Sequence, residues 1–235
     1  MATDFSRLNT GRAGAADQAV LDEGLRSYML KVYNYVASGL ALSGAAAAFT
    51  ASTPVVYNAV FGTPLQWVVM LLPLGLLFMM GRGSVQTTKI LYWVMVTSFG
   101  ISISYIFHVY TAESVVRVFF ITAVTFGAMS LYGYTTKRDL SGMGSFLIMG
   151  LFGIIIASVV NIFLESSMLQ FVVSVLGVLI FTGLTAFDTQ RIKSEYYHGH
   201  DQEIQEKGAI MGAVSLYLNF LNLFMMLLSL LGNRE

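Results

Sequence analysis

The segment MGSFLIMGLFGIIIASVVNIFL, residues 143–164, contains no charged side chain. An α-helix of roughly 20 apolar residues crosses the hydrocarbon core of a bilayer, so this segment is long enough to span a membrane. The rest of the chain has the same character, because 56% of its 235 residues are hydrophobic and only 11% are charged. A soluble domain carries about a quarter of charged residues. The sequence therefore predicts an integral membrane protein.

Six further apolar segments resemble this one, so we expect an all-α, polytopic bundle of seven transmembrane helices. The absence of strand-like alternation favours helices over a β-barrel. The predicted spans are residues 28–50, 65–80, 90–109, 114–134, 143–164, 168–191 and 208–231. Residues 1–27 are polar, and we expect a flexible cytoplasmic tail there, followed by one seven-helix domain over residues 28–235.

The positions of the basic residues predict the orientation of this bundle. Of the 13 Lys and Arg residues, eleven fall on one side of the seven spans and two on the other. The eleven are Arg7, Arg12, Arg26, Lys31, Arg82, Lys89, Lys137, Arg138, Arg191, Lys193 and Lys207, and the two are Arg117 and Arg234. Cytoplasmic loops carry the excess of basic residues. We therefore expect a cytoplasmic N-terminus and a C-terminus on the opposite side of the membrane, which is the periplasmic side if the membrane is a bacterial inner membrane.

Several classes of function lack the residues that they need. The net charge is zero, so nothing indicates a nucleic-acid partner, and the absence of cysteine excludes disulfides and thiolate metal sites. The last span has no lysine for a retinal Schiff base, and no HExxH motif or nucleophile with a base indicates intramembrane proteolysis. We expect no enzymatic activity and no cofactor. His198 and His200, beside Asp201, have a loose metal-like spacing that a cytoplasmic loop explains better.

Asp188 is the one well-embedded acidic side chain in the predicted spans, within FTGLTAFDTQRIK, residues 181–193. A carboxylate inside a membrane is costly and is a functional candidate by default. It also lies near the C-terminal end of its helix, where the macrodipole disfavours a negative charge. We interpret Asp188 as functional, and the alternative is a simple i,i+3 contact with Arg191 at the membrane edge.

The last span carries a polar face that can meet Asp188. Ser215, Asn219 and Asn222 recur at i, i+4 and i+7 and therefore share one side of the helix. At 1.5 Å per residue, Asp188 and Asn219 lie roughly 10 and 12 Å inside the same end of the bundle. We expect the two side chains to approach each other, although interhelical hydrogen bonding alone explains the asparagines equally well.

Three segments together resemble the bacterial branch of the Bax inhibitor-1 family, also called the transmembrane Bax inhibitor motif family. They are SLYGYTTKRDLSGMGSFLIMG (130–150), GLTAFDTQRIK (183–193) and SLYLNFLNLF (215–224). The resemblance implies seven helices with the last one central, and a pH-sensitive calcium leak in the bacterial inner membrane. It also implies that two facing aspartates sense protons and that an arginine after the second helix latches onto them. Asp188 matches the first aspartate, and Arg82 in FMMGRGS is the counterpart of the arginine.

The second aspartate is replaced by Asn219 in LYLNF. Two close carboxylates cannot both ionise readily and titrate as a pair, whereas an Asp–Asn pair has no such like-charge repulsion. We therefore expect a shallower pH response than the resemblance implies. Ca²⁺ prefers six to eight oxygen ligands, so one carboxylate at Asp188 with amide oxygens predicts passage or weak binding.

Two other functions remain open at this point. One is a non-transporting regulator that binds other membrane proteins, such as a quality-control protease or stress-response partners, and the loss of one carboxylate favours it. The other is calcium/proton exchange. The expected partners are the lipid bilayer, Ca²⁺ and protons. Other membrane proteins, such as a quality-control protease, are expected partners if the chain is a regulator.

Overall fold

The computed structural model describes the backbone of residues 4–197 and 201–234 and the side chains of residues 22–197 and 201–234. Over these residues the fold is all-helical, apart from one isolated β-bridge between Tyr110 and Arg234. The helices are α1 (Asp4–Ser52), α2 (Pro54–Phe61), α3 (Leu65–Met80), α4 (Val85–Ile103), α5 (Ile106–Val109), α6 (Ala112–Thr135), α7 (Ser141–Leu164), α8 (Ser167–Glu195) and α9 (Gln202–Leu231).

Six helical segments are long and apolar enough to cross a membrane, within the described part of the chain. They contain six of the seven predicted spans. The remaining one, residues 65–80, is α3, whose 16 residues extend only about 24 Å, less than the roughly 30 Å of the hydrocarbon core. The short α2 precedes it at an angle of 80°, so α2 and α3 make a seventh span only if the bent pair is taken as one.

Prolines and hydroxyl caps explain where the helices break. Pro54 occupies the first turn of α2, where its missing N–H costs nothing, but it cannot continue α1, which ends at Ser52. The side chains of Ser84, Thr111 and Ser166 accept hydrogen bonds from the first-turn N–H groups of α4, α6 and α8, respectively. α8 and α9 extend several residues beyond the predicted spans, because polar residues continue both helices at this end.

The N-terminal tail and one loop lie partly outside the described residues. α1 begins at Asp4, so helical backbone occupies residues 4–27, where the sequence predicts a flexible tail. The side chains of residues 1–21 are outside the description, and the cytoplasmic location of the tail stays a prediction. His198 and His200, with the loose metal-like spacing, also fall outside the described residues.

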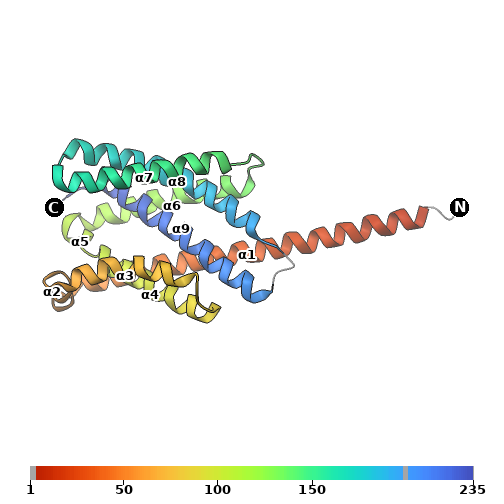
Figure 1. Ribbon diagram of the computed structural model, residues 1–235, viewed down its shortest axis with the longest axis horizontal. Helices are drawn as coiled ribbons and strands as arrows, with labels where there is room; N and C mark the ends of the chain where they lie inside the picture. The colour runs from red at the N-terminus through yellow and green to blue at the C-terminus, as the bar shows by residue number, and fades with distance from the viewer. Residues whose placement is uncertain (1–3, 198–200, 235) are drawn as a thin grey trace.

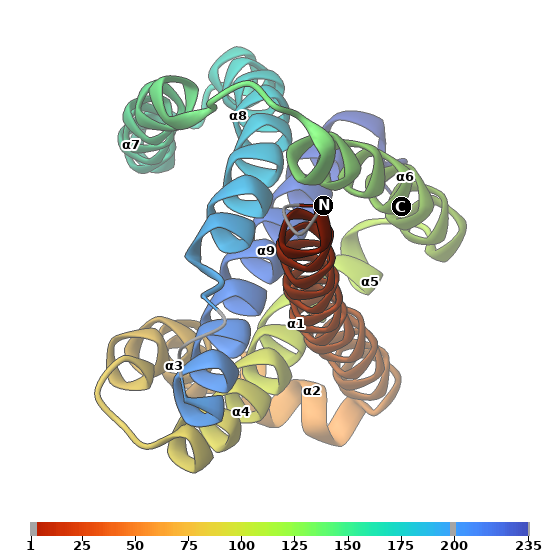
Figure 2. The same ribbon diagram turned by 90° about the vertical axis from the view of Figure 1, so that its right-hand side faces the viewer.

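α9 packs against α1, α4, α6 and α8, and it runs diagonally between the other helices (Figures 1 and 2). α7 and α8 lie on one side of it and α3 and α4 on the other. Half of the most apolar stretch of α9 is buried inside the bundle, whereas only 6% of the most apolar stretch of α7 is buried. α7 packs mainly on α8. α7 therefore presents most of its surface to the surroundings of the bundle.

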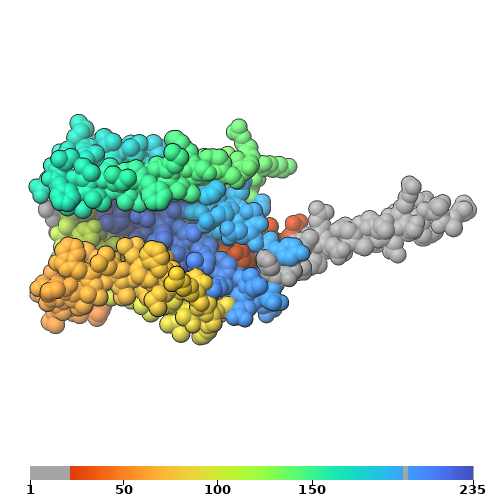
Figure 3. Space-filling model, viewed as in Figure 1, coloured from red at the N-terminus to blue at the C-terminus, as the bar shows by residue number. Residues whose placement is uncertain are grey.

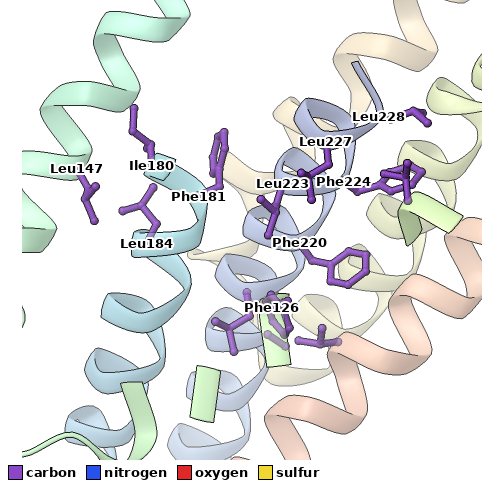
Figure 4. Packing of buried hydrophobic residues seen from close by; sticks show 14 of the residues in the cluster. Phe126, Leu147, Ile180, Phe181, Leu184, Phe220, Leu223, Phe224, Leu227 and Leu228 are labelled. Atoms are coloured by element: carbon purple, nitrogen blue, oxygen red, sulfur yellow. The ribbon is translucent and has the colours of Figure 1, made fainter. Parts of the chain in front are cut away.

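The buried apolar side chains form two clusters around α9. The larger one joins α6, α8 and α9 through Phe126, Phe181, Phe220 and Phe224 (Figure 4). The smaller one joins α4 and α9 and includes Tyr92 and Tyr217. Lipid tails are as apolar as these side chains, so the packing between helices depends on close van der Waals contact and on small residues that allow it.

Gly133 is such a residue, at the contact between α6 and α8. A Cβ atom at this position would lie 2.9 Å from the carbonyl carbon of Ala186, which is backbone and cannot move aside. We expect Gly133→Ala to lower the free energy of unfolding by about 1–3 kcal/mol, the usual cost of overpacking. The measurement is the temperature at which the detergent-solubilised protein, heated and then passed over a size-exclusion column, no longer elutes as a monodisperse peak.

Gly127→Ala is the matched control, because it lies on the same helix and a Cβ atom there meets nothing within 4 Å. This variant keeps the parent's stability or gains up to about 1 kcal/mol of helix propensity. Equal stabilities of the two variants would contradict the close α6–α8 contact.

Candidate functional site

Asp188 lies on α8, and its carboxylate is held by two donors. The Asn219 Nδ2 of α9 donates a hydrogen bond to Oδ2 of Asp188 over 2.7 Å. The Arg191 Nη2, one turn further along α8, lies 2.8 Å from Oδ1. Asp188 is only 9% exposed and Asn219 only 6%. Both carboxylate oxygens therefore have a partner, as a buried charge requires.

The Arg191 guanidinium joins this pair to a third side chain. Its Nη2 also donates to the Ser215 Oγ over 3.1 Å, so Arg191 links α8 to α9. Its Nε lies 3.8 Å from Glu195 Oε1. The side chain of Arg191 is 41% exposed, so the charged cluster begins in the interior at Asp188 and ends at a more open edge.

The contact between α8 and α9 depends on small side chains near this cluster. At Gly212 of α9, a Cβ atom would lie 3.1–3.2 Å from three carbon atoms of Ile192, so glycine allows the two helices to approach closely. Asp188 and Ile192 are four residues apart and thus near each other along α8. The positive Arg191 and the Asn219 donor also offset the unfavourable macrodipole at the end of α8.

A cavity of about 740 Å³ opens at this cluster, between α7 on one side and α3 with Phe99 of α4 on the other. Figure 3 shows the hollow between these helices, with α8 and α9 at its floor. Its walls are mostly Leu, Ile and Phe side chains. Its polar lining consists of Asp188, Arg191, Ser215, Asn219, Asn222 and Ser158. The polar face predicted for the last span, Ser215, Asn219 and Asn222, therefore faces this cavity.

Comparisons with known proteins identify the family of the chain. The family profile described as "Inhibitor of apoptosis-promoting Bax1" matches residues 25–235. The chain belongs to the Bax inhibitor-1 family. An uncharacterized protein of Rickettsia prowazekii is 52% identical over 91% of this chain and 92% of its own length. One of Caulobacter vibrioides is 48% identical over 99% of both chains. The inner membrane protein YbhL of Escherichia coli is 44% identical over 90% of this chain and 94% of its own.

The Bax inhibitor-1 resemblance assigns a latch to Arg82, and the structure places this residue elsewhere. Arg82 is exposed in the turn between α3 and α4, and it does not line the Asp188 cavity. The Lys207 Nζ fixes this turn by donating to the carbonyl oxygens of Gly81 and Gly83 over 3.1 and 2.8 Å. Asp188 instead forms an ion pair with Arg191, which is the i,i+3 contact expected from the sequence as the alternative interpretation of Asp188. The latch by Arg82 stays a prediction.

Elsewhere in the described residues, charged and aromatic side chains make separate contacts away from the Asp188 cavity. His108 stacks on Tyr57 with ring centroids 4.1 Å apart, and Arg117 donates to the Leu231 carbonyl oxygen. Lys89 Nζ and Glu206 Oε1 form an ion pair at 2.5 Å that joins α4 to α9. The sequence did not predict this pair, because the two residues are far apart in the chain. Among the described residues, no three His, Asp or Glu side chains are placed to hold a metal ion.

The Asp188–Asn219 contact makes a prediction about stability and pH. Asn219→Asp places a second carboxylate beside Asp188, and both become ionised and repel each other as the pH rises. We expect the thermal stability of this variant, relative to the parent, to fall between pH 5 and pH 8. The measurement is the elution-based melting temperature at a series of pH values.

Asn222→Asp is the control, because it lines the same cavity but Asn222 bonds to the Leu218 carbonyl oxygen of its own helix. Its stability should follow the parent more closely across the same pH range. A parallel loss of stability in both variants would mean that the loss comes from placing any carboxylate in the cavity and not from repulsion by Asp188.

Proposed function

We propose that this Bax inhibitor-1 family protein is a pH-sensitive calcium leak of the bacterial inner membrane, with Asp188 as the proton sensor. The observation that carries the proposal is the Asp188 carboxylate, held by Asn219 and Arg191 at the floor of a cavity with mostly apolar walls. Ionisable groups inside a membrane bundle typically mark ion pathways or proton relays. The inner-membrane location of YbhL supports the same membrane for this chain.

The proposal includes a topology. We take α2 and α3 together as the second of seven spans, with α9 as the central helix. The excess of basic residues on one side then puts the N-terminus in the cytoplasm and the C-terminus in the periplasm. With this orientation the Asp188 cluster lies near the cytoplasmic face, where it responds to cytoplasmic pH.

In this mechanism Arg191 excludes Ca²⁺ from the space beside Asp188. While Arg191 pairs with Asp188, its positive charge occupies the site and repels a cation. A proton on Asp188 removes the charge that holds Arg191, and the guanidinium is then free to turn toward Ser215 and Glu195, both of which it already contacts. Arg82 is the family's candidate for a second latch, acting from the α3–α4 turn.

The oxygen atoms around Asp188 favour passage of Ca²⁺ over tight binding. The side-chain oxygens of Asp188, Asn219 and Asn222 supply fewer ligands than the six to eight that Ca²⁺ prefers. Because Asn219 does not titrate, one proton is bound per site. The expected dependence of flux on pH therefore has the slope of a single-proton transition.

The experiment is Ca²⁺ flux into dye-loaded liposomes that contain the purified protein, from pH 5 to pH 8. We expect the parent to follow a one-proton curve, Asp188→Ala to lose the pH dependence, and Asn219→Asp to respond more steeply because two carboxylates titrate together. A two-proton transition in the parent, or an unchanged curve in Asp188→Ala, would contradict Asp188 as the sensor.

Two arginine variants separate the possible latches in the same assay. Arg191→Gln removes the observed partner of Asp188, whereas Arg82→Gln removes only the exposed residue of the α3–α4 turn. The larger change in the pH curve is expected for Arg191→Gln. The opposite ranking would assign the latch to Arg82.

A regulator that binds other membrane proteins is the second candidate, because the site holds one carboxylate where the family pattern has two. Such a protein conducts no Ca²⁺ when it is reconstituted alone, and it co-purifies with a partner such as a quality-control protease. If neither the parent nor Asn219→Asp conducts, transport is abandoned in its favour. Calcium/proton exchange would instead acidify or alkalinise the liposome lumen in step with Ca²⁺ movement.

A further inference from the structure

The polar face of α9 continues beyond the Asp188 cavity. Ser215, Asn219 and Asn222 are followed by Met226 and Ser229 at the same alternating spacing of four and three residues. Residues at this spacing lie on one side of a helix. We call these five residues the α9 seam. From Ser215 to Ser229 it extends over 15 residues, or about 21 Å along the helix axis, which is most of the roughly 30 Å hydrocarbon core.

A second cavity lies at the far end of the seam, near the α7–α8 turn. Its volume is about 390 Å³, and Ser158, Ile162 and Met226 line it together with the Asp188 cavity. The two cavities therefore adjoin each other along α9. Figure 1 shows that the α7–α8 turn and the end of α9 lie at the end of the bundle opposite the N-terminus.

The lining of this far cavity is rich in neutral oxygen atoms from α7, α8 and α9. The polar residues are Ser158, Asn161, Gln170, Ser174 and Ser229. Ser174 Oγ donates to Ser229 Oγ over 3.1 Å, and Asn161 Oδ1 accepts from the Ser166 N–H over 3.0 Å. Hydroxyl and amide oxygens replace part of the hydration shell of a cation, and without carboxylates they do not hold it tightly.

Met226 is the one seam residue without an oxygen or nitrogen atom in its side chain, and it lies where the two cavities meet. Its side chain rests on Gly177 of α8, where a Cβ atom would lie 2.8 Å from Cγ and 2.9 Å from Sδ. Glycine at this position makes room for the thioether. Methionine is unbranched and adaptable, and an apolar constriction in a wet path stops ions by excluding water.

We propose that the α9 seam is the route by which water and cations reach Asp188 from the α7–α8 end, and that Met226 is the apolar gate on this route. The identity of the ion rests on the proposed function, whereas the route itself does not. The gate is separate from the Asp188 sensor, because Met226 lies about two turns of α9 beyond Asn219, with Asn222 between them.

Cysteine labelling tests the route without any assumption about the ion, because the chain has no cysteine of its own. Single variants Asn222→Cys and Ser229→Cys lie on opposite sides of Met226 along the seam. A charged, membrane-impermeant thiol reagent is added to sealed vesicles on the side of the α7–α8 turn. Exposed Ser167→Cys, in the first residue of α8 beside that turn, identifies the side that is labelled.

In the parent background, Ser229→Cys is expected to react at least about tenfold faster than Asn222→Cys, a ratio that a barrier of about 1.4 kcal/mol produces. Adding Met226→Ser should remove most of this difference. Met225→Ser is the matched control, because Met225 is the neighbouring methionine and lines neither cavity. Met226→Leu, which stays apolar, should keep the barrier.

Equal reaction rates at Asn222→Cys and Ser229→Cys in the parent would overturn the gate, and this comparison needs no variant at Met226. The same holds if Met226→Ser and Met225→Ser accelerate Asn222→Cys equally. An unreactive Ser229→Cys would overturn the route.

Ca²⁺ flux separates this inference from the proposed function. If labelling follows the seam but no variant conducts Ca²⁺, the route stands and the calcium leak fails. If the parent conducts, Met226→Ser should raise the rate about tenfold while Met225→Ser leaves it unchanged. Conduction with equal rates in these two variants supports the leak and contradicts Met226 as its gate.

Discussion

The interior of a membrane bundle is a poor solvent for a charged group, so the Asp188 carboxylate depends on donors and a countercharge that the protein supplies. This constraint explains the arrangement around α8 and α9. Asn219 supplies a donor across the helix contact, and Arg191 supplies a countercharge from the next turn of the same helix. Ser215 in turn orients the guanidinium. The close approach of α8 and α9 at Gly212 is what brings these groups within reach of one another.

The amide at Asn219 changes the chemistry that a pair of carboxylates would have. An amide donates to an ionised aspartate without repelling it, so the site is compatible with a charged Asp188 paired to Arg191. Two carboxylates in the same place would share protons and titrate as a unit. The Asp188 site therefore binds one proton in the proposed mechanism, where two carboxylates could bind two. In the proposed mechanism, Arg191 takes the controlling role that the second carboxylate would have shared.

A large part of the fold and of the site follows from the sequence. Apolar length alone locates six of the membrane helices, and counting residues from the helix ends places Asp188 and Asn219 at similar depth, where the structure joins them. The short α3 and its 80° bend to α2 could not be predicted, because the apolar run around Pro73 reads as a complete span. The choice between Arg82 and Arg191 depends on where the α3–α4 turn lies, which Lys207 fixes through contacts distant in the chain. The continuation of the polar face past Asn222 is also hidden, since Met226 interrupts it with an apolar residue.

The most direct test of the account is infrared difference spectroscopy on the reconstituted protein between pH 5 and pH 8, with Asp188→Asn as the reference. The C=O stretch of a protonated carboxyl reports the proton on Asp188 itself, independently of any flux. The account predicts one carboxyl band that is absent from Asp188→Asn, follows a single-proton curve, and has the same midpoint as the Ca²⁺ flux. A flux that changes with pH while no Asp188-dependent band titrates would contradict it.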